Sequence, residues 1–265
     1  MNFFSGLLKN RRLIWQMILR DISSRYKGTF FGLFWAIVTP IFMLAIYSFV
    51  FTKIFNGRWD LPDASGQFDF AIILFLGLIL YNLMAEVITV SPKLILNNKN
   101  FVKKVVFPLE VLPAISIGTA VFHAMLSVVI LLIFQLFARQ YIPFTFWFFP
   151  LMVVPFLFLT MGISLILAAL GVFIRDLNQI IRPLMTALLF LAPIVYPTSL
   201  LPEQVQPLIL LNPLSFIVEQ ARDVVIIGKL PNVMGWVYYT LVSLIVFILG
   251  SFIFNRSKKA FADVL

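Results

Sequence analysis

Long runs of apolar residues without charge dominate the chain, and short polar or basic segments separate them. A bilayer core about 30 Å thick needs roughly 20 apolar residues for each crossing helix. Runs of this kind predict six transmembrane helices, at about 30–54, 70–90, 111–138, 146–173, 183–201 and 232–254. The fifth is the least regular, because Pro193 and Pro197 interrupt it. We therefore expect an all-α integral membrane protein that forms a single transmembrane domain over residues 1–265.

The composition excludes an ordinary soluble enzyme. Hydrophobic residues make up 62% of the chain and charged residues 12%, whereas soluble domains average about 45–50% and about 25%. The chain has no Cys, so a disulfide framework, a thiol nucleophile and a Cys-ligated metal site are excluded as well.

The basic residues are sorted to one side of the predicted membrane. The net charge is +9, and of the 20 Lys and Arg residues 15 fall on the side that holds both termini. The remaining 5 are Lys53, Arg58, Arg139, Arg222 and Lys229. Because basic residues are retained on the cytoplasmic face, both termini are expected to be cytoplasmic. The positive charge is thus a topology signal and does not indicate nucleic-acid binding.

Residues 1–27 have the pattern of an amphipathic helix lying along the membrane surface. Polar residues recur at spacings of three and four from Ser5 to Lys27, while Ile14, Ile18 and Ile22 occupy the opposite face. Such a helix lies in the cytoplasmic interface with its basic face toward lipid headgroups. A simple polar anchor for the first span is the alternative.

The outer loop between the last two spans is too apolar to be solvated. Asn212 and Pro213 form a helix start, and Gly228 offers a stop. The helix between these residues would have an apolar stripe and a separate polar stripe, and the polar stripe contains Ser215, Glu219 and Arg222. With the preceding apolar piece 205–211, this pattern predicts re-entrant outer helices over 202–229. A single interfacial helix that serves only packing remains the alternative.

The cytoplasmic segment 91–110 mixes basic and apolar residues, as a surface that docks on another protein does. An interfacial helix that touches lipid is the alternative. The segment 174–177, with Arg175 and Asp176, is a shorter candidate for the same docking surface.

Two ionisable residues, Glu86 and His123, lie inside predicted spans. Such residues are a default sign of function, but the sequence gives no partner for either. A proton relay needs a series of such groups, so we expect them to be satisfied structural residues at a helix interface.

No motif for catalysis is present. The chain has no G-x-x-x-x-G-K-[ST] phosphate loop, no H-E-x-x-H and no G-x-S-x-G. We therefore expect no catalytic residue, no metal site and no cofactor on this chain, and energy supplied from elsewhere.

Several short motifs, in this order and spacing, give a resemblance over nearly the whole chain. They are Arg20–Ile22, Arg25–Gly28, Gly32–Trp35 leading into Pro40, Phe173–Leu177, Asn212–Leu214, and then Glu219, Arg222 and Gly228. With six spans, they resemble the type 2 ABC exporter permeases that move polysaccharides such as O-antigen, capsule and teichoic acid.

This resemblance implies a homodimer around a translocation path in the bacterial inner membrane, docked to two copies of a cytoplasmic ATPase that holds ATP and Mg²⁺. It implies that 91–110 is the coupling segment, that the N-terminal helix is a cytoplasmic gate, and that the outer helices are a second gate. The expected ATPase-coupling residues are Lys99, Phe101, Lys103, Lys104, Arg175 and Asp176. The expected outer-gate residues are Asn212, Pro213, Glu219 and Arg222.

Two further sets of candidate residues concern the transported molecule. Aromatic faces give sugar rings a sliding surface, and the candidates for the substrate path are Trp35, Tyr47, Phe51, Phe190 and Tyr196. A lipid-facing aromatic belt is the alternative. The candidates for holding the diphosphate of a lipid carrier at the entrance are Arg20, Arg25 and Lys27.

The resulting prediction is the membrane subunit of an ABC exporter for a lipid-linked polysaccharide, driven by a separate ATPase. The alternatives are an exporter of the same family for a small hydrophobic drug or lipid, and a membrane-embedded acyl- or glycosyltransferase. The last requires a catalytic His or acidic pair at the membrane face, and His123 in mid-span is poorly placed for it.

Overall fold

The protein is described from a computed structural model that covers residues 6, 9–50, 68–102, 107–196, 198, 202, 204, 206, 209 and 212–264. Throughout these ranges the secondary structure is helical, without a strand. The longer helices are α2 (Arg11–Tyr26), α3 (Trp35–Phe49), α4 (Asp69–Val90), α7 (Val111–Arg139), α8 (Phe149–Phe173), α9 (Leu177–Leu191), α11 (Pro213–Arg222) and α12 (Val233–Ser257). Short segments are η1 (Gly32–Phe34), η3 (Ser91–Lys93), α5 (Leu94–Asn97), α6 (Lys99–Val102), η4 (Phe144–Phe148), the π-helical η6 (Asp223–Ile227), η7 (Lys258–Ala260) and α13 (Phe261–Val264).

Five helical stretches of the described chain are long and apolar enough to cross a membrane. They are Gly32–Phe49, Asp69–Asn97, Val111–Arg139, Phe144–Phe173 and Val233–Ala260. The all-helical membrane architecture is therefore confirmed, with five candidate spans in place of the predicted six.

The fifth predicted span, over 183–201, is wrong in its bounds. The helix there is α9, which begins at Leu177, includes Pro183 and ends at Leu191. Ala192 is extended (φ −86°, ψ 146°) because a residue that precedes a proline, here Pro193, is disfavoured in the helical region. Proline thus ends α9 after 15 residues, and α9 is a shorter apolar helix than the five candidate spans.

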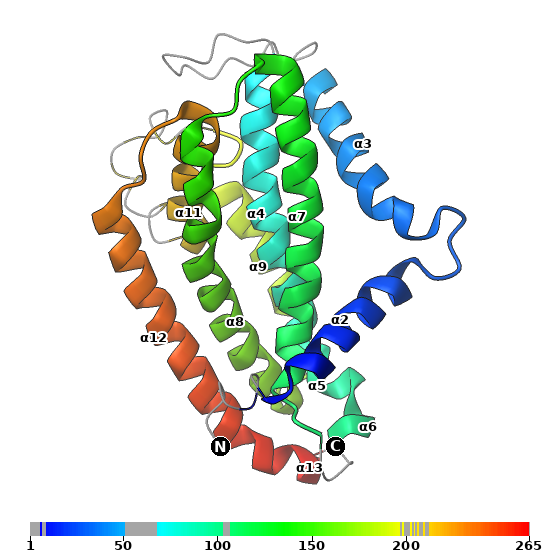
Figure 1. Cartoon of the computed structure of the whole chain (residues 1–265). Helices are drawn as coiled ribbons and strands as arrows, with labels where there is room; N and C mark the ends of the chain where they lie inside the picture. The colour runs from blue at the N-terminus through cyan, green and yellow to red at the C-terminus, as the bar shows by residue number, and fades with distance from the viewer. Residues whose placement is uncertain are drawn as a thin grey trace.

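The central pair α4 and α7 runs side by side through the molecule, with α8 beside it and α12 along the outer flank of α8 (Figure 1). Most of α4 is enclosed by other helices. In the stretch Asp69–Asn97, which begins with α4, 78% of an apolar run of 18 residues is buried. α11 packs on α4 and α8.

Glycines allow two unusually close helix contacts on α8. A Cβ at Gly250 of α12 would lie 2.3 Å from the Gly162 carbonyl oxygen, and one at Gly171 would lie 2.0 Å from the Pro92 carbonyl oxygen. Backbones approach this closely in membranes where residues are small. These contacts fix α12 and η3 against α8.

α2 and α3 form a V that stands out from the body (Figure 1). At its apex Gly28 (φ 85°) and Gly32 (φ 52°) adopt the left-handed backbone that favours glycine. One arm, α2, returns to the lower part of α7, and the other, α3, leads to the upper part of α4 and α7.

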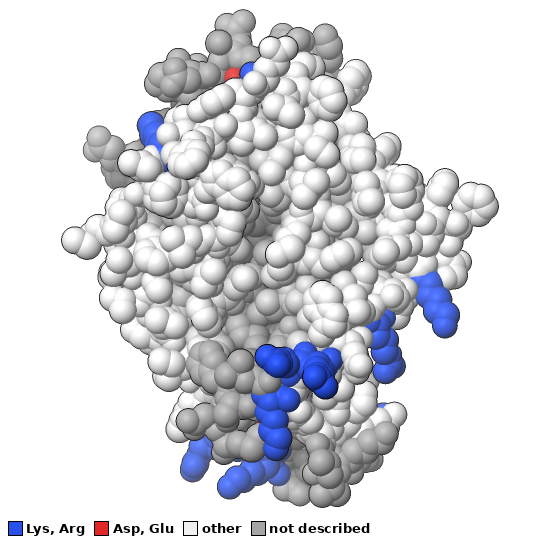
Figure 2. All heavy atoms as spheres, in the orientation of Figure 1, with Lys and Arg blue, Asp and Glu red and all other residues white. Residues whose placement is uncertain are grey.

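Figure 2 shows one face of the molecule, on which basic residues are separated from a region without charged residues. Lys and Arg gather over the end of the molecule where Figure 1 places α2 and α13, and the broad middle of this face carries no charged residue. This distribution agrees with the charge asymmetry along the sequence.

We predict that Gly250→Val destabilises the chain by about 1–3 kcal/mol, the usual cost of overpacking. The added side chain meets the backbone of Gly162, which has no flexible end that could move away. Thermal unfolding of the purified chain, followed by tryptophan fluorescence, measures the loss.

The matched control is Ala45→Val on the exposed side of α3. Equal unfolding temperatures for the two variants would contradict the close α8–α12 contact.

Candidate functional site

A cavity of about 340 Å³ lies between the V and the central pair, lined by residues of α2, α3, α4 and α7. Its aromatic lining includes Trp35 and Tyr47, two of the predicted path residues. Its polar lining consists of Tyr26, Thr39, Asn82, Glu86, His123 and Ser127. Thr39 and Asn82 are exposed, so the cavity opens to the surface of the described chain.

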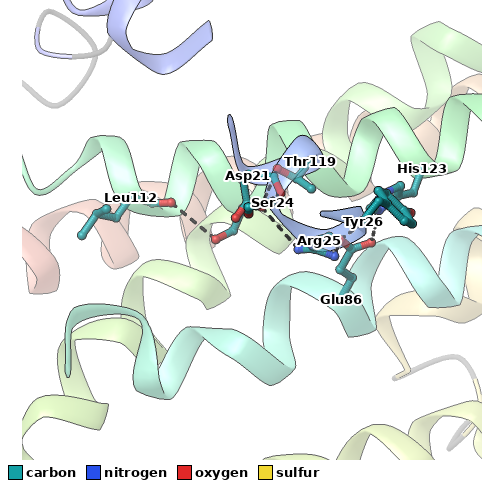
Figure 3. A network of polar contacts seen from close by, with 9 residues as sticks. Asp21, Ser24, Arg25, Tyr26, Glu86, Leu112, Thr119 and His123 are labelled. Atoms are coloured by element: carbon teal, nitrogen blue, oxygen red, sulfur yellow. Dashed lines mark hydrogen bonds and ion pairs between the residues drawn. The ribbon is translucent and has the colours of Figure 1, made fainter. Parts of the chain in front are cut away.

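A network of polar contacts forms one wall of this cavity (Figure 3). The Arg25 guanidinium of α2 donates to Oε1 of Glu86 on α4. Nδ1 of His123 on α7 lies 3.1 Å from both Glu86 carboxylate oxygens, and its Nε2 lies 3.1 Å from the Tyr26 hydroxyl. A neutral imidazole satisfies all these contacts when Nδ1 donates to Glu86 and Nε2 accepts from Tyr26. Burial raises the pKa of Tyr26, so its hydroxyl stays protonated and able to donate.

The same network extends along α2. Thr119 of α7 donates to Asp21 through Oγ1, at 2.9 Å, and Arg25 also lies 3.5 Å from Asp21. Together with Ile22, which is buried, these contacts attach α2 to α4 and α7.

Glu86 and His123 are therefore satisfied at a helix interface, as expected, but sequence reasoning missed both their partners and their position at the cavity. The partners from α2 are distant in the sequence. Arg25 lies 61 residues before Glu86, and Tyr26 lies 97 residues before His123. The one available signal was an intramembrane carboxylate together with a basic residue just before the first span.

The predicted diphosphate residues are not brought together. Arg20 and Lys27 are exposed on α2, whereas the Arg25 guanidinium is directed to Glu86 and Asp21. Arg20 instead lines a separate cavity of about 200 Å³ between α2, the 91–102 segment and α7.

The two predicted coupling segments meet at one end of the molecule. Ser91 Oγ lies 2.7 Å from Ser164 Oγ, and η3 packs along the end of α8 that leads to Arg175 and Asp176. Arg175, Asp176 and Lys99 are exposed. Phe101 stacks on Phe107, with ring centroids 4.3 Å apart, while Lys103 and Lys104 lie outside the described residues.

The outer helix α11 starts as predicted. Asn212 is its N-cap and accepts from the Leu214 amide at 2.9 Å, and Pro213 occupies the first turn. The left-handed Gly228 (φ 85°) ends the helical stretch.

Two residues of the predicted polar stripe, Ser215 and Arg222, are buried, while Glu219 is half-buried. Ser215 is fully buried and Arg222 is 6% exposed, with its guanidinium donating to the Pro193 carbonyl at 2.7 Å. Burial lowers the pKa of Arg222 to about 10, while the carboxylates of Glu219 and Asp223 act in the opposite direction. The predicted piece 205–211 lies largely outside the described residues.

Side chains from neighbouring elements cap the carbonyls of the π-helical turn η6. Thr145 donates to Val224 at 2.7 Å, Gln135 to Val225 at 3.0 Å, and Arg139 to Ile226 at 2.8 Å. Arg139 also donates to Asp69, at 2.5 Å, through its Nε. We call these four side chains, of Asp69, Gln135, Arg139 and Thr145, the outer clamp.

The remaining predicted path residues lie elsewhere. The Tyr196 hydroxyl donates to the Phe190 carbonyl at 2.8 Å, but neither residue lines the cavity, and Phe51 lies outside the described residues. Over the described ranges, no group of three or more His, Asp or Glu side chains is placed to hold a metal ion.

The chain is similar to one known family and to several known transport proteins. The family described as "ABC-2 type transporter" matches residues 12–226. The O-antigen export system permease protein RfbA of Klebsiella pneumoniae is 27% identical over 249 residues, covering 93% of this chain and 92% of the relative. RfbA of Myxococcus xanthus is 27% identical, covering 97% and 96%, and the polysialic acid transport protein KpsM of Escherichia coli is 24% identical, covering 97% of each.

We predict that Arg139→Leu loosens η6 and destabilises the chain by about 3–5 kcal/mol, because it removes the cation beside the buried Asp69 carboxylate. Thr145→Val removes one hydrogen bond and costs about 1 kcal/mol. Hydrogen exchange of the amides of 223–228 and thermal unfolding measure both effects.

The double variant Arg139→Leu, Asp69→Asn should recover part of the loss. Arg256→Leu, at an exposed basic position of α12, is the control. Unchanged exchange at 223–228 in Arg139→Leu would contradict a role for the outer clamp.

Proposed function

The chain belongs to the ABC-2 type transporter family, and from that premise we propose that it is the membrane-spanning subunit of an exporter for a lipid-linked, O-antigen-like polysaccharide. One observation carries this proposal: relatives named for O-antigen export and for polysialic acid transport both align over more than nine-tenths of the chain. Both are named for moving long sugar polymers, which favours a glycan over a small drug or lipid.

We propose six crossings of the bacterial inner membrane, with α9 and the residues after it as the fifth. The basic end faces the cytoplasm and holds both termini. α11 and η6 then form part of a re-entrant outer gate. Their burial supports this, since backbone and polar groups at membrane depth must be enclosed by protein.

In the proposed complex, two copies of this chain flank the path and each docks on a cytoplasmic ATPase subunit that holds ATP and Mg²⁺. The exposed residues Lys99, Arg175 and Asp176 support the docking surface, because η3 joins the two segments that carry them. Movement of the ATPases would reach α8 through η3, whose backbone meets Gly171.

The proposed cargo path uses aromatic faces. Trp35 and Tyr47 beside a cavity support this, and Phe51, Phe190 and Tyr196 remain candidates from the sequence. Arg20 and Lys27 are free to attract the carrier diphosphate, while Arg25 would first have to leave Glu86 and Asp21.

Deletion of the gene should remove the lipid-linked polysaccharide from the cell surface and leave it inside. Immunoblotting of surface and intracellular glycan tests this. Normal surface glycan in the deletion strain would refute the proposed cargo.

We predict that Lys99→Glu lowers both ATPase co-purification and glycan export several-fold, because a charge is reversed on the proposed docking surface. ATP hydrolysis by the purified complex and surface glycan measure the two effects. Lys229→Glu reverses an exposed charge at the opposite end and is the control. Equal loss in both variants would argue against a specific docking surface.

We also predict that Arg20→Glu, Lys27→Glu lowers export while ATPase co-purification stays normal, since these residues would act on the carrier headgroup. Arg12→Glu, on the same exposed face of α2, controls for general attraction to anionic lipid. Export that is unchanged in the double variant would remove these residues from the path.

A further inference from the structure

The lining of the 340 Å³ cavity has a definite chemical character. It combines hydroxyls, an amide, a carboxylate and an imidazole with the ring of Trp35, and no Lys or Arg belongs to the described lining. The one carboxylate, Glu86, is already paired with Arg25, and no cation of the described lining is left to bind an anion such as a diphosphate. A neutral ring rich in hydroxyl groups matches the mixture of hydrogen-bonding groups and an aromatic face.

The size agrees with such a ligand. Small-molecule sites span about 300–1,000 Å³, and this cavity lies near the lower limit. It therefore suits one or two sugar rings and is too small for a folded stretch of polymer.

Glu86 and His123 each have two roles in this geometry. They line the cavity, and they also hold the Arg25 guanidinium and the Tyr26 hydroxyl of α2. The carboxylate of Glu86 has few acceptor positions, and Arg25 and His123 already share its Oε1. A ligand hydroxyl that binds Glu86 or His123 competes directly with the attachment of α2.

We propose that Glu86 and His123 form a sugar-released latch, which holds α2 against α4 and α7 and lets it go when a sugar unit occupies the cavity. The proposal rests on the proposed function for its ligand class and adds a binding site and a link from that site to α2. The Asp21–Thr119 contact lies outside the cavity lining and keeps α2 near α7 after release.

The absence of native Cys permits a direct test. Ser23→Cys places a spin label on the exposed face of α2, in the full chain reconstituted in nanodiscs of phosphatidylethanolamine and phosphatidylglycerol, which carry no sugar. Methyl glucoside, methyl mannoside and methyl N-acetylglucosaminide are titrated, and inorganic pyrophosphate serves as the anionic probe. At least one glycoside should mobilise the label saturably, while pyrophosphate should not.

Variants separate the latch from the cavity. In Glu86→Gln the label should be mobile from the start and lose its response to sugar. In Asn82→Leu or Thr39→Val, which alter only the lining, starting mobility should match the parent and the sugar midpoint should rise about tenfold, the effect of one lost hydrogen bond. Asp21→Asn should raise starting mobility but retain the sugar response.

Three results would overturn the latch: no response to any glycoside, a response to pyrophosphate alone, or an unchanged midpoint in both lining variants. The label requires neither ATP nor export. A chain that exports glycan but ignores the sugars refutes the latch only. A sugar response in a chain whose deletion leaves surface glycan normal supports the latch and refutes only the proposed function.

Discussion

Pairing of polar groups among apolar helices is the constraint on which the rest of this structure depends. A charged or hydrogen-bonding group between such helices is costly unless it has a partner. Among the described residues, two polar networks join distant segments, one around Glu86 and the outer clamp around Arg139. Each attaches a helix that does not itself cross the membrane, α2 at one end and α11 with η6 at the other. Polar contacts thus hold the proposed gates, while apolar packing forms the body.

The body and the attached helices obey different packing rules. α8 meets α12 and η3 through backbone contacts at glycine, which leave no space for a side chain to rearrange. α2 packs through apolar side chains, with Ile22 buried and Ile14, Met17 and Ile18 partly buried, and it adds hydrogen bonds and ion pairs that can exchange. Close backbone packing of α8, α12 and η3, with α2 attached through contacts that can exchange, fits a protein in which α2 moves relative to the core.

The sequence was a good guide to whatever depends on local composition. Uncharged runs located α4, α7, α8 and α12, and Asn212, Pro213 and Gly228 marked the ends of the outer helical stretch. It was a poor guide to contacts between distant segments. The partners of Glu86 and the carbonyls capped by Gln135 and Thr145 depend on how helices are placed, which periodicity does not encode. The polar stripe of α11 was visible from its spacing, but the burial of Ser215 and Arg222 was not, because amphipathic spacing does not show which surface a stripe faces.

The apex of the V has a mechanical consequence. A Cβ built at Gly28 or Gly32 would meet no heavy atom within 4 Å, and the ring contacts of Phe31 with Phe30, Phe34 and Trp35 stay within the connection and the start of α3. The angle between the two arms is then set at their far ends, by the polar contacts of α2 and by the packing of α3 on α4 and α7. The two arms are thus tied to the central pair at their far ends and are joined to each other through the short connection between Tyr26 and Trp35.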